Sequence, residues 1–277
     1  MLRLLRRPPA KPPAAAPPPP ATPPDEWERK FRELEARHVE EIRRGNPTYD
    51  SDDLRVWNKH ADFMQDERFV ASYQAGIHSD HQLNPDPDHP DIHIEWRIHV
   101  CCWAAAHARH LPGDFVECGT NTGIMSLAIC RYIDFNSTGK RFFLFDTYEG
   151  IPAEQILPEE GHAHQQNRIF RDCFDIAKRN FSPYPAAVLV RGKVPDTLPS
   201  QPIGQVCYLM LDMNIVTPER AALEYFWDRM VPGGVILFDD YGWIGYDAQK
   251  RAHDDFATRH GVEILTLPTG QGMLLKA

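Results

Sequence analysis

Acidic residues and glycines in this chain stand where strands of a parallel sheet would end. Residues 115–123 begin as an apolar run, reach Glu117, and pass through Gly119 and Gly123 into a helical pattern. A later apolar run ends at Asp146. At the carboxyl edge of a parallel sheet, the glycines would let a ligand approach the backbone, and Asp146 could accept hydrogen bonds from a ribose. The pattern therefore predicts a nucleoside site.

The glycine spacing separates the possible nucleoside cofactors. The dinucleotide fingerprint Gly-x-Gly-x-x-Gly is absent, because position 121 is Asn. A carboxylate at the strand end would also repel a pyrophosphate. S-adenosylmethionine carries an ammonium group and a ribose but no phosphate, so it fits this edge better than NAD. We expect the cofactor to be bound by Glu117, Gly119, Thr120, Gly123, Asp146 and Thr147.

Three further carboxylates follow two later apolar runs. Asp212 comes directly after residues 206–211, and Asp239 and Asp240 come directly after residues 235–238. If these strands are neighbours, the carboxylates converge and repel one another unless a cation or proton intervenes. Mg²⁺ prefers such oxygen ligands and can bind a substrate hydroxylate. We expect a Mg²⁺ site on Asp212, Asp239 and Asp240; the alternative is that Asp239 and Asp240 only cap a turn.

The group that would take the proton from an acceptor hydroxyl is less directly marked. Asp212 is the first candidate because it lies at the expected metal edge, although a tightly ligating Asp212 would leave the proton to water. His162 and His164 are the alternative. They lie in the segment 159–166, where a lid over the site would close, and loop histidines of this kind can equally be exposed bystanders.

From residue 114 onward, strand and helix patterns alternate, which is typical of an α/β fold with a doubly wound, mostly parallel sheet. Two apolar runs around a short turn at 268–272 predict a C-terminal antiparallel hairpin over 262–276. The expected strands are 115–117, 141–146, 187–190, 205–212 and 234–239. The expected helices are 124–133, 167–180, 218–230 and 247–259.

Local signals set some of these boundaries. Thr217 and Pro218 have the residue types of an N-cap and a first helical position. Gly233 and Gly234 are expected to end the same helix after Met230.

An earlier helix is expected over 92–110, covering the first strand of the sheet. Its Trp96, Arg97 and Trp103 could frame the methionine end of the cofactor or the acceptor, but the helix core is the preferred interpretation. The histidines between 78 and 110 invite a zinc hypothesis. No cysteine pair accompanies them and prolines interrupt their spacing, so we do not favour it.

The N-terminal part divides by composition. Residues 1–24 are rich in proline and alanine and contain no acidic residue, so a disordered tail is expected. Residues 25–44 predict an amphipathic helix with Trp27, Phe31, Leu34 and Ile42 near one face. That helix could dock on the body or pair with a second chain in a homo-oligomer. The expected division is a tail at 1–24, a helical N-terminal extension at 25–113 and a cofactor-binding domain at 114–277.

Composition limits the partners and the compartment. The 277 residues carry a net charge of −9, which argues against nucleic acid as the main partner and favours a small-molecule substrate. The six cysteines contain no Cys-x-x-Cys pair and lie mostly in apolar runs. No convincing signal peptide and no membrane-spanning stretch is present. We expect a cytoplasmic protein.

Four ordered motifs over roughly residues 90–277 resemble the macrocin O-methyltransferase family, a branch of the class I methyltransferases. They are Asp114-Phe-Val-Glu-Cys-Gly, Leu144-Phe-Asp-Thr-Tyr-Glu-Gly, Val194-Pro-Asp-Thr-Leu and Pro232-Gly-Gly-Val-Ile-Leu-Phe-Asp-Asp-Tyr-Gly-Trp. The resemblance implies S-adenosylmethionine-dependent, Mg²⁺-assisted methyl transfer to a hydroxyl, often on a sugar of a natural product.

One position departs from the family pattern. The family usually has a second aspartate two residues after the first, whereas this chain has Asn214 after Asp212. One charge fewer bears on metal affinity, although an amide oxygen can still ligate. Asn214 keeps open a methyltransferase-like domain that binds without turnover. An NAD-linked oxidoreductase or epimerase of related fold is the other alternative, disfavoured by the missing third glycine and the C-terminal hairpin.

Overall fold

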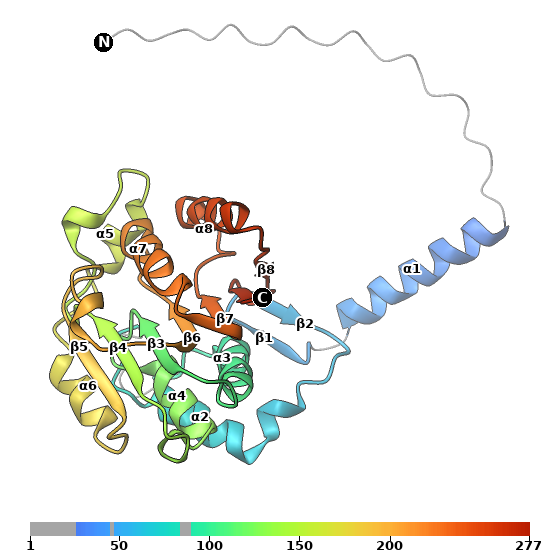
Figure 1. The fold of residues 1–277 in the computed structure, drawn as a ribbon. Coiled ribbons are helices and arrows are strands. Elements are labelled where there is room, and N and C mark those ends of the chain that lie inside the picture. Colours follow the sequence, from blue (N-terminus) through green and yellow to red (C-terminus); the bar gives the residue numbers. More distant parts are fainter. Residues whose placement is uncertain (1–25, 45–46, 84–89) are drawn as a thin grey trace, which may run out of the picture. The chain divides into compact units, whose positions relative to one another are not determined.

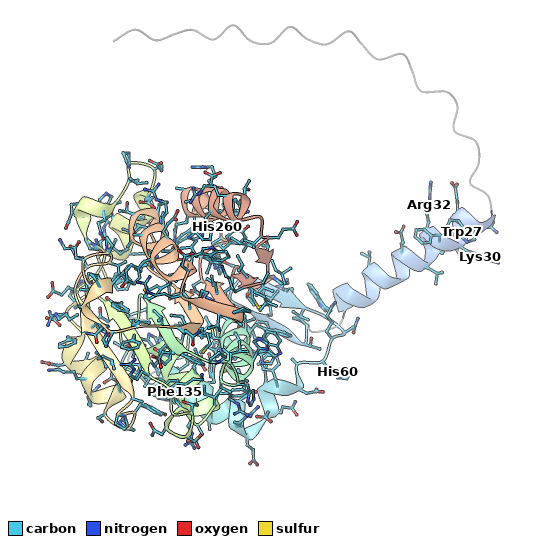
Figure 2. All side chains as sticks on the ribbon, viewed as in Figure 1. Trp27, Lys30, Arg32, His60, Phe135 and His260 are labelled. Atoms are coloured by element: carbon cyan, nitrogen blue, oxygen red, sulfur yellow. The ribbon has the colours of Figure 1, made fainter. Side chains whose placement is uncertain are left out.

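The computed structural model describes residues 26–44, 47–83 and 90–277, and the chain divides into two compact units, residues 1–47 and 48–277. In the first unit, helix α1 spans Glu26–Arg44, as predicted. Its Trp27 and Phe31 rings stack with centroids 5.3 Å apart, and Trp27, Phe31 and Leu34 are exposed (Figure 2). The predicted tail at 1–24 lies outside the described residues.

The second unit is built on a seven-stranded sheet whose order is β5-β4-β3-β6-β7-β9-β8 (Figure 1). The first five strands in this order are parallel, and β9 runs antiparallel to both β7 and β8. The strands are β3 Asp114–Cys118, β4 Phe142–Asp146, β5 Ala187–Arg191, β6 Val206–Leu211, β7 Met230–Phe238, β8 Leu265–Thr266 and β9 Gly272–Leu275. The predicted doubly wound sheet with a C-terminal antiparallel hairpin is confirmed.

Helices cover both faces of the sheet. The longer helices are α2 Glu67–Ile77, α3 Glu95–Ala108, α4 Ile124–Tyr132, α6 Phe174–Phe181, α7 Val216–Trp227 and α8 Asp247–His260. Side chains alternate along β3, so Phe115 packs into the core under α2, α3 and α4, whereas Val116 packs into the core under α7 and α8. Because both faces are covered, the strands are largely apolar, as the sequence pattern indicated.

Aromatic side chains fill the core beneath α4. The Phe115 ring lies 5.0 Å from the Tyr208 ring, 5.4 Å from Phe135 and 5.6 Å from Phe142, measured between centroids. Phe135, labelled in Figure 2, belongs to the 3₁₀ turn Phe135–Ser137 and is fully buried. This packing fixes β3 and β6 side by side, and the cavity described below lies at their carboxyl ends.

Two short strands precede the sheet, and the sequence analysis did not predict them. β1 Tyr49–Ser51 pairs antiparallel with β2 Leu54–Val56. Asp52 and Asp53 form the turn, both with φ of 52°, the left-handed conformation that two-residue hairpins require. The Tyr49 hydroxyl donates to the His93 carbonyl oxygen at 2.7 Å. The hairpin is thereby fastened to the segment that leads into α3.

Several predicted boundaries were wrong. The helix expected over 167–180 is replaced by α5 Gly161–Gln166 and α6, which begins only at Phe174. Gly233 and Gly234 do not end a helix, because α7 stops at Trp227 and both glycines lie inside β7.

Local signals also misplaced the start of α7. The helix begins at Val216, with no side-chain cap. The Thr217 hydroxyl instead donates to the Gln155 carbonyl oxygen at 2.9 Å, so tertiary contacts override the local capping signal. The helix expected over 92–110 is the shorter α3; of the strands, it contacts β6 and β7 most closely, and its buried side chains share one core cluster with Phe115 of β3.

Three more 3₁₀ turns connect the larger elements, at Asp62–Gln65, Ala153–Gln155 and Leu198–Ser200. Among the described residues, no helix combines the length and the apolar character that crossing a lipid bilayer would demand.

Candidate functional site

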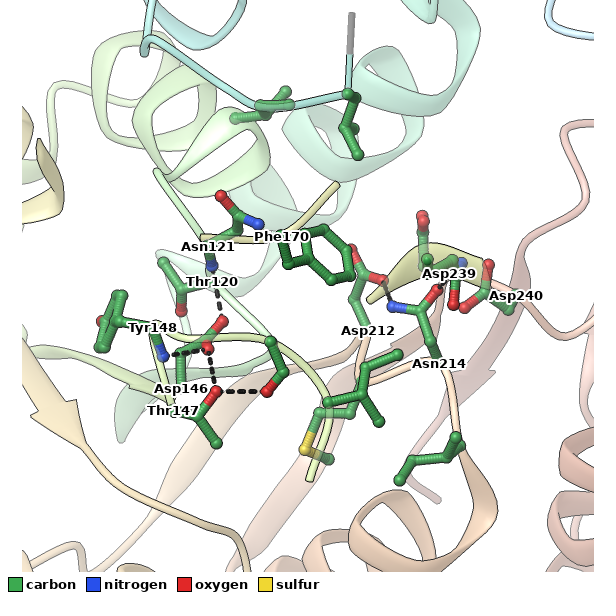
Figure 3. Close-up of a pocket in the computed structure, with 18 of the residues that line it drawn as sticks. Thr120, Asn121, Asp146, Thr147, Tyr148, Phe170, Asp212, Asn214, Asp239 and Asp240 are labelled. Atoms are coloured by element: carbon green, nitrogen blue, oxygen red, sulfur yellow. Dashed lines mark hydrogen bonds between the residues drawn. The ribbon is translucent and has the colours of Figure 1, made fainter. Parts of the chain in front are cut away.

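A cavity of about 410 Å³ opens at the carboxyl ends of β3, β4, β6 and β7. Its residues form two groups, which are separate in Figure 3. We call the first the cofactor half; it contains Glu117, Gly119, Thr120, Asp146 and Thr147. We call the second the acidic half; it contains Arg97, Asp212, Asn214, Asp239 and Asp240. The sheet topology therefore brings the two predicted sites together in one cavity.

Gly119 lies where the loop after β3 touches the loop after β6. Its φ is +97°, and a Cβ atom built on it would lie 1.8 Å from the carbonyl oxygen of Asp212. The Gly119 amide donates to the Phe145 carbonyl at 2.8 Å, and the Asp212 amide donates to the Cys118 carbonyl at 2.9 Å. Glycine is required here by the close approach of the backbone, and this approach joins the two halves of the cavity.

Gly123 does not line the cavity. It has φ of +105°, and a Cβ atom on it would lie 2.6 Å from the Phe181 ring. The structure thus gives a packing reason for this glycine, which precedes α4.

Asp146 binds the backbone of two loops. Its Oδ2 accepts from the Asn121 amide at 2.6 Å, and its Oδ1 accepts from the Tyr148 amide at 2.6 Å (Figure 3). Both donors have positive φ, 50° for Asn121 and 57° for Tyr148. Burial raises the pKa of Asp146, while the backbone hydrogen bonds oppose that rise. The Thr147 hydroxyl lies 3.3 Å from Oδ1 as well, and Asp146 lines the cavity, so its carboxylate orders two loops where a ligand could also reach it.

The other predicted cofactor residues differ in how free their polar atoms are. Glu117 is buried, its Oε2 has no hydrogen-bond partner, and burial raises its pKa well above the usual range, with Asp212 and Asp146 adding to the rise. Thr120 is buried at the cavity wall. The Thr147 hydroxyl is already engaged, since it donates to the Gly150 carbonyl at 2.6 Å.

The acidic half holds more negative charge than its hydrogen bonds satisfy. Burial raises the pKa of Asp212 to about 7, opposed by Arg97 and reinforced by Glu219. The pKa of Asp240 is raised well above its usual range by burial and then by the charges of Asp212 and Glu219. Asp240 is buried, and its Oδ2 has no hydrogen-bond partner. These two carboxyl groups are therefore stable only if a cation binds between them or if they are protonated.

Asp239 is already paired. Its Oδ2 accepts from Arg97 Nη2, and its Oδ1 accepts from Gln271 Nε2 at 3.0 Å. The sequence pattern favours a position for Arg97 in the helix core and gives no signal for Gln271. Arg97 instead lines the cavity, whereas Trp103 of the same helix is half exposed. A buried aspartate at the end of a strand needs a hydrogen-bond donor or a cation as partner. Nothing in the linear sequence indicates which distant residue supplies it.

The donors present suit Mg²⁺, because Asp212, Asp239 and Asp240 offer only oxygen ligands and Asp240 has an unsatisfied oxygen. In the described part of the chain, one set of three residues has ligand atoms within 4.8 Å of one another, and it is Asp91, His93 and Glu95 rather than these three aspartates. The aspartates would have to draw closer to share one ion, and Asp239 would have to share its carboxylate with Arg97.

A buried pair supports the loop that carries Asp212. Glu219 of α7 accepts through Oε1 from the amides of Met213 at 2.8 Å and Asn214 at 3.2 Å. His253 Nε2 lies 3.2 Å from Glu219 Oε2, and both side chains are almost fully buried. Asn214 has φ of +63°, a conformation that Asn tolerates better than most residues. Glu219 therefore fixes the backbone that aims Asp212 at the cavity.

The segment that contains α5 binds the same loop from the other side. His162 Nε2 lies 2.8 Å from the Asn214 carbonyl oxygen. Gln166 Nε2 donates to Asn214 Oδ1 at 2.6 Å and to the Tyr246 hydroxyl at 2.8 Å. His164 is exposed. The expected lid thus lies beside the site, and Asn214 is the residue to which it is fastened.

The sequence profile of Macrocin-O-methyltransferase (TylF) matches residues 97–266. The chain is 28% identical over 170 residues to the 8-demethyl-8-(2,3-dimethoxy-alpha-L-rhamnosyl)-tetracenomycin-C 4'-O-methyltransferase of Streptomyces olivaceus, covering 58% of this chain and 64% of that protein. It is 25% identical over 174 residues to the mycinamicin III 3''-O-methyltransferase of Micromonospora griseorubida, covering 58% and 66%. The matches thus span just under two thirds of the length of these relatives.

Among solved structures, the fold is similar to that of the O-methyltransferase NovP, with a TM-score of 0.57 and 22% identity over 65% of this chain and 79% of that one. A calicheamicin methyltransferase gives a TM-score of 0.55 at 15% identity over 78% and 94%. At these identities the likeness concerns the fold.

Proposed function

The chain belongs to the macrocin O-methyltransferase family, and from that premise we propose that it transfers the methyl group of S-adenosylmethionine to a hydroxyl of a sugar-bearing or natural-product-like small molecule. The observation that carries the proposal is the single cavity with an anchored carboxylate, Asp146, in one half and unsatisfied carboxylates in the other. The names of the two relatives support the substrate class, because both are O-methyltransferases of small molecules and the first name contains a rhamnosyl group.

The cofactor half would bind S-adenosylmethionine through chemistry that its residues already display. The cavity-lining carboxylate of Asp146 suits the ribose hydroxyls, and Gly119 lets the cofactor lie against the backbone. Glu117 lines the same cavity, and its Oε2 has no hydrogen-bond partner, so Glu117 would suit the methionine ammonium, directly or through water. Thr120 lines this half beside them, whereas Gly123 would act only by shaping the loop.

In the acidic half, we propose Asp212 as the general base. In the metal-free site, a carboxyl whose pKa lies at about 7 can accept a proton from an acceptor hydroxyl near neutral pH and release it to water afterward. If Asp212 ligates Mg²⁺, water takes the proton instead. Transfer of the methyl group to the acceptor oxygen would break its bond to the sulfonium sulfur and leave S-adenosylhomocysteine with a neutral thioether. Holding both reactants in line would supply much of the rate enhancement.

A Mg²⁺ ion bound by Asp212, Asp239 and Asp240 would lower the pKa of the acceptor hydroxyl and neutralise the charge of the cluster. Support for this ligand set comes from the unsatisfied Asp240 Oδ2 and from the oxygen-only donors. Asn214 adds an amide in place of the aspartate usual in the family, and its Nδ2 lies 3.5 Å from Asp212 Oδ1. It would steady the base rather than act as one.

The proposal is tested by calorimetric titration of the full chain with S-adenosylhomocysteine, in Mg²⁺ and again in chelator. Binding in the micromolar range, about −8 kcal/mol, is expected in both conditions. Asp146→Ala should weaken it severely, while Asp134→Ala, a matched exposed aspartate, should not. Labelled S-adenosylmethionine would then be offered with a panel of glycosylated acceptors. Absence of cofactor binding contradicts the proposal; binding without turnover across the panel favours the non-catalytic alternative.

For the setting of the protein, we propose a cytoplasmic enzyme without nucleic-acid partners. All six cysteines are buried and unpaired, which suits a reducing compartment. The exposed Trp27, Phe31 and Leu34 of α1 support a homo-oligomer formed through that helix. Deleting residues 1–45 should reduce the particle in solution to a single chain, as its mass would show. An unchanged number of chains per particle would contradict an oligomer formed through α1.

A further inference from the structure

Arg97 connects two carboxylates on opposite sides of the cavity wall. Its Nη2 donates to Asp239 Oδ2 in the acidic half, and its Nη1 lies 3.7 Å from Asp52 Oδ1. Asp52 stands in the turn of the β1–β2 hairpin and is not among the cavity-lining residues. The three side chains are largely buried, with exposed fractions of 17% for Arg97, 13% for Asp52 and 2% for Asp239. The guanidinium of Arg97 thus lies between Asp239, which lines the cavity, and Asp52, which does not.

The same guanidinium also acts on the rest of the acidic half. Its charge stabilises the ionised forms of both Asp212 and Asp240. Asp240 nevertheless keeps an oxygen that no group satisfies, so Arg97 balances Asp239 but leaves a place for further positive charge. A divalent cation would supply that charge. One of its three ligands, Asp239, is already bound by the guanidinium of Arg97. Two cations on one carboxylate repel each other strongly in a dry site.

The contact between Arg97 and Asp52 gives the guanidinium an alternative partner. The Tyr49 hydroxyl of the hairpin lies 2.7 Å from the His93 carbonyl oxygen and 3.0 Å from Glu95 Oε2 and shares its one hydrogen between them, so the hairpin is held against the start of α3. Asp52 is therefore kept near Arg97 whatever occupies the cavity. Its pKa is raised by burial, and Arg97 opposes that rise, which indicates a carboxyl that gains from a closer cation.

We propose that Arg97 is a resident counter-ion that competes with the divalent cation for Asp239, and that Asp52 receives the guanidinium when the cation binds. The hairpin would then set the metal affinity of a site that it does not itself line. This inference rests on the metal site proposed above. It concerns metal affinity alone, so S-adenosylhomocysteine binding in chelator remains an independent test of the methyltransferase assignment.

The test is calorimetric titration of the full chain with Mn²⁺, in the wild type and in single variants. Arg97→Gln should bind Mn²⁺ at least about 10-fold more tightly, because the competing charge is gone. Asp52→Asn should bind about 3-fold more weakly, because the displaced guanidinium loses its second acceptor. Equal or weaker Mn²⁺ binding by Arg97→Gln would overturn the proposal and make Arg97 an orienting partner of Asp239.

Removing Arg97 leaves the buried Asp239 with Gln271 but without a charged partner, so that variant could fail to fold without metal. Arg97→Lys provides a second measurement, because a lysine keeps the charge but cannot bridge two carboxylates. It should bind Mn²⁺ as weakly as Asp52→Asn does; tighter binding than the wild type would contradict the proposal. Unchanged S-adenosylhomocysteine affinity in chelator would show that each variant is folded.

The location of the ion needs its own control, because Asp91, His93 and Glu95 form a second possible ligand set close to the hairpin. Hydrogen bonds from Tyr73 and Tyr49 already occupy Asp91 and Glu95. Asp240→Asn should abolish Mn²⁺ binding, and His93→Gln should leave it intact. The reverse result, or no Mn²⁺ binding by any variant, would overturn the inference, while the cofactor titration would still decide the methyltransferase assignment.

Discussion

The two halves of the cavity use the same side chain in opposite ways. In the cofactor half, the carboxylate of Asp146 is satisfied by the backbone amides of Asn121 and Tyr148 before any ligand arrives. In the acidic half, burial raises the pKa of Asp212 and of Asp240 with no hydrogen bond from a described backbone amide to oppose the rise, and Asp240 keeps an unpaired oxygen. The first half is preformed, whereas the second half is incomplete without a cation or protons.

This difference follows from where the charge is compensated. Backbone amides in tight turns are fixed by the fold, so they stabilise Asp146 at every stage of a reaction cycle. The acidic half depends on Arg97 and on whatever binds, so its electrostatics change with occupancy. We therefore expect perturbations of the cofactor half to alter affinity for the nucleoside, and perturbations of the acidic half to alter turnover and metal binding.

The largest expected effect is the loss of turnover in Asp212→Asn. Removing a general base typically costs 10²- to 10⁴-fold, and we expect about 10³-fold in kcat. The affinity for S-adenosylhomocysteine in chelator should change less than about 2-fold, because the nucleoside contacts the other half. Asp228→Asn, an exposed aspartate at the end of α7, is the matched control. Turnover within about 10-fold of the wild type would remove Asp212 as the base.

The second largest expected effect is a loss of stability where Gly119 brings the loops after β3 and β6 together. Gly119→Ala would place a Cβ atom 1.8 Å from the Asp212 carbonyl oxygen at a φ of +97°. We expect it to lower the free energy of unfolding by more than about 3 kcal/mol, measured by urea denaturation. Gly139→Ala shares a positive φ, +69°, but meets nothing within 4 Å, so it should cost about 1 kcal/mol. If both variants lose the same unfolding free energy, the loops after β3 and β6 can move apart readily.

Asp146→Asn should weaken S-adenosylhomocysteine binding by roughly 10- to 30-fold, about 2 kcal/mol. The amide keeps one acceptor oxygen but loses the charge and one partner for the amides of Asn121 and Tyr148. Mn²⁺ affinity should stay within about 2-fold if the halves are independent. A loss of metal binding equal to the loss of nucleoside binding would show instead that the cavity responds as one unit.

The raised pKa of Asp212 predicts how stability depends on pH in chelator. Between the ordinary aspartate pKa of 3.8 and the folded value of about 7, the folded state binds more protons than the unfolded state. Stability due to this group therefore falls as pH rises through that window. Compared with Asp212→Asn, the wild type should lose at least about 1 kcal/mol more unfolding free energy between pH 4 and pH 8. Parallel pH profiles for the two proteins would contradict the shift.

The smallest expected effect concerns the lid. Gln166→Leu removes hydrogen bonds to Asn214 and Tyr246, which should lower kcat/KM for the acceptor by about 3- to 10-fold, or about 1 kcal/mol. Nucleoside affinity should not change. Gln165→Leu, its exposed neighbour on α5, is the control. If both substitutions behave alike, α5 contributes to the site only through its general packing.

Much of the fold could be predicted because it repeats a local pattern. The apolar runs that end at Glu117, Asp146, Asp212 and Asp239 each became a parallel strand, and topology then brought their ends to one edge. The short β1–β2 hairpin and the divided helix near 161–181 were not predicted, because their boundaries depend on tertiary contacts such as Glu160 Oε1 accepting from the Val216 amide at 2.6 Å.

The sequence by itself determined which acidic residues end the strands, since a buried parallel strand must be apolar until the edge where polar groups can be solvated or bound. Only the tertiary structure decided what compensates each charge. Asp146 meets backbone amides of its own loop and of the loop after β3, whereas Asp239 meets the side chains of Arg97 and Gln271 from distant segments. The reason is physical: strand periodicity is local, but the field at a carboxylate is the sum over every group that folding brings near it.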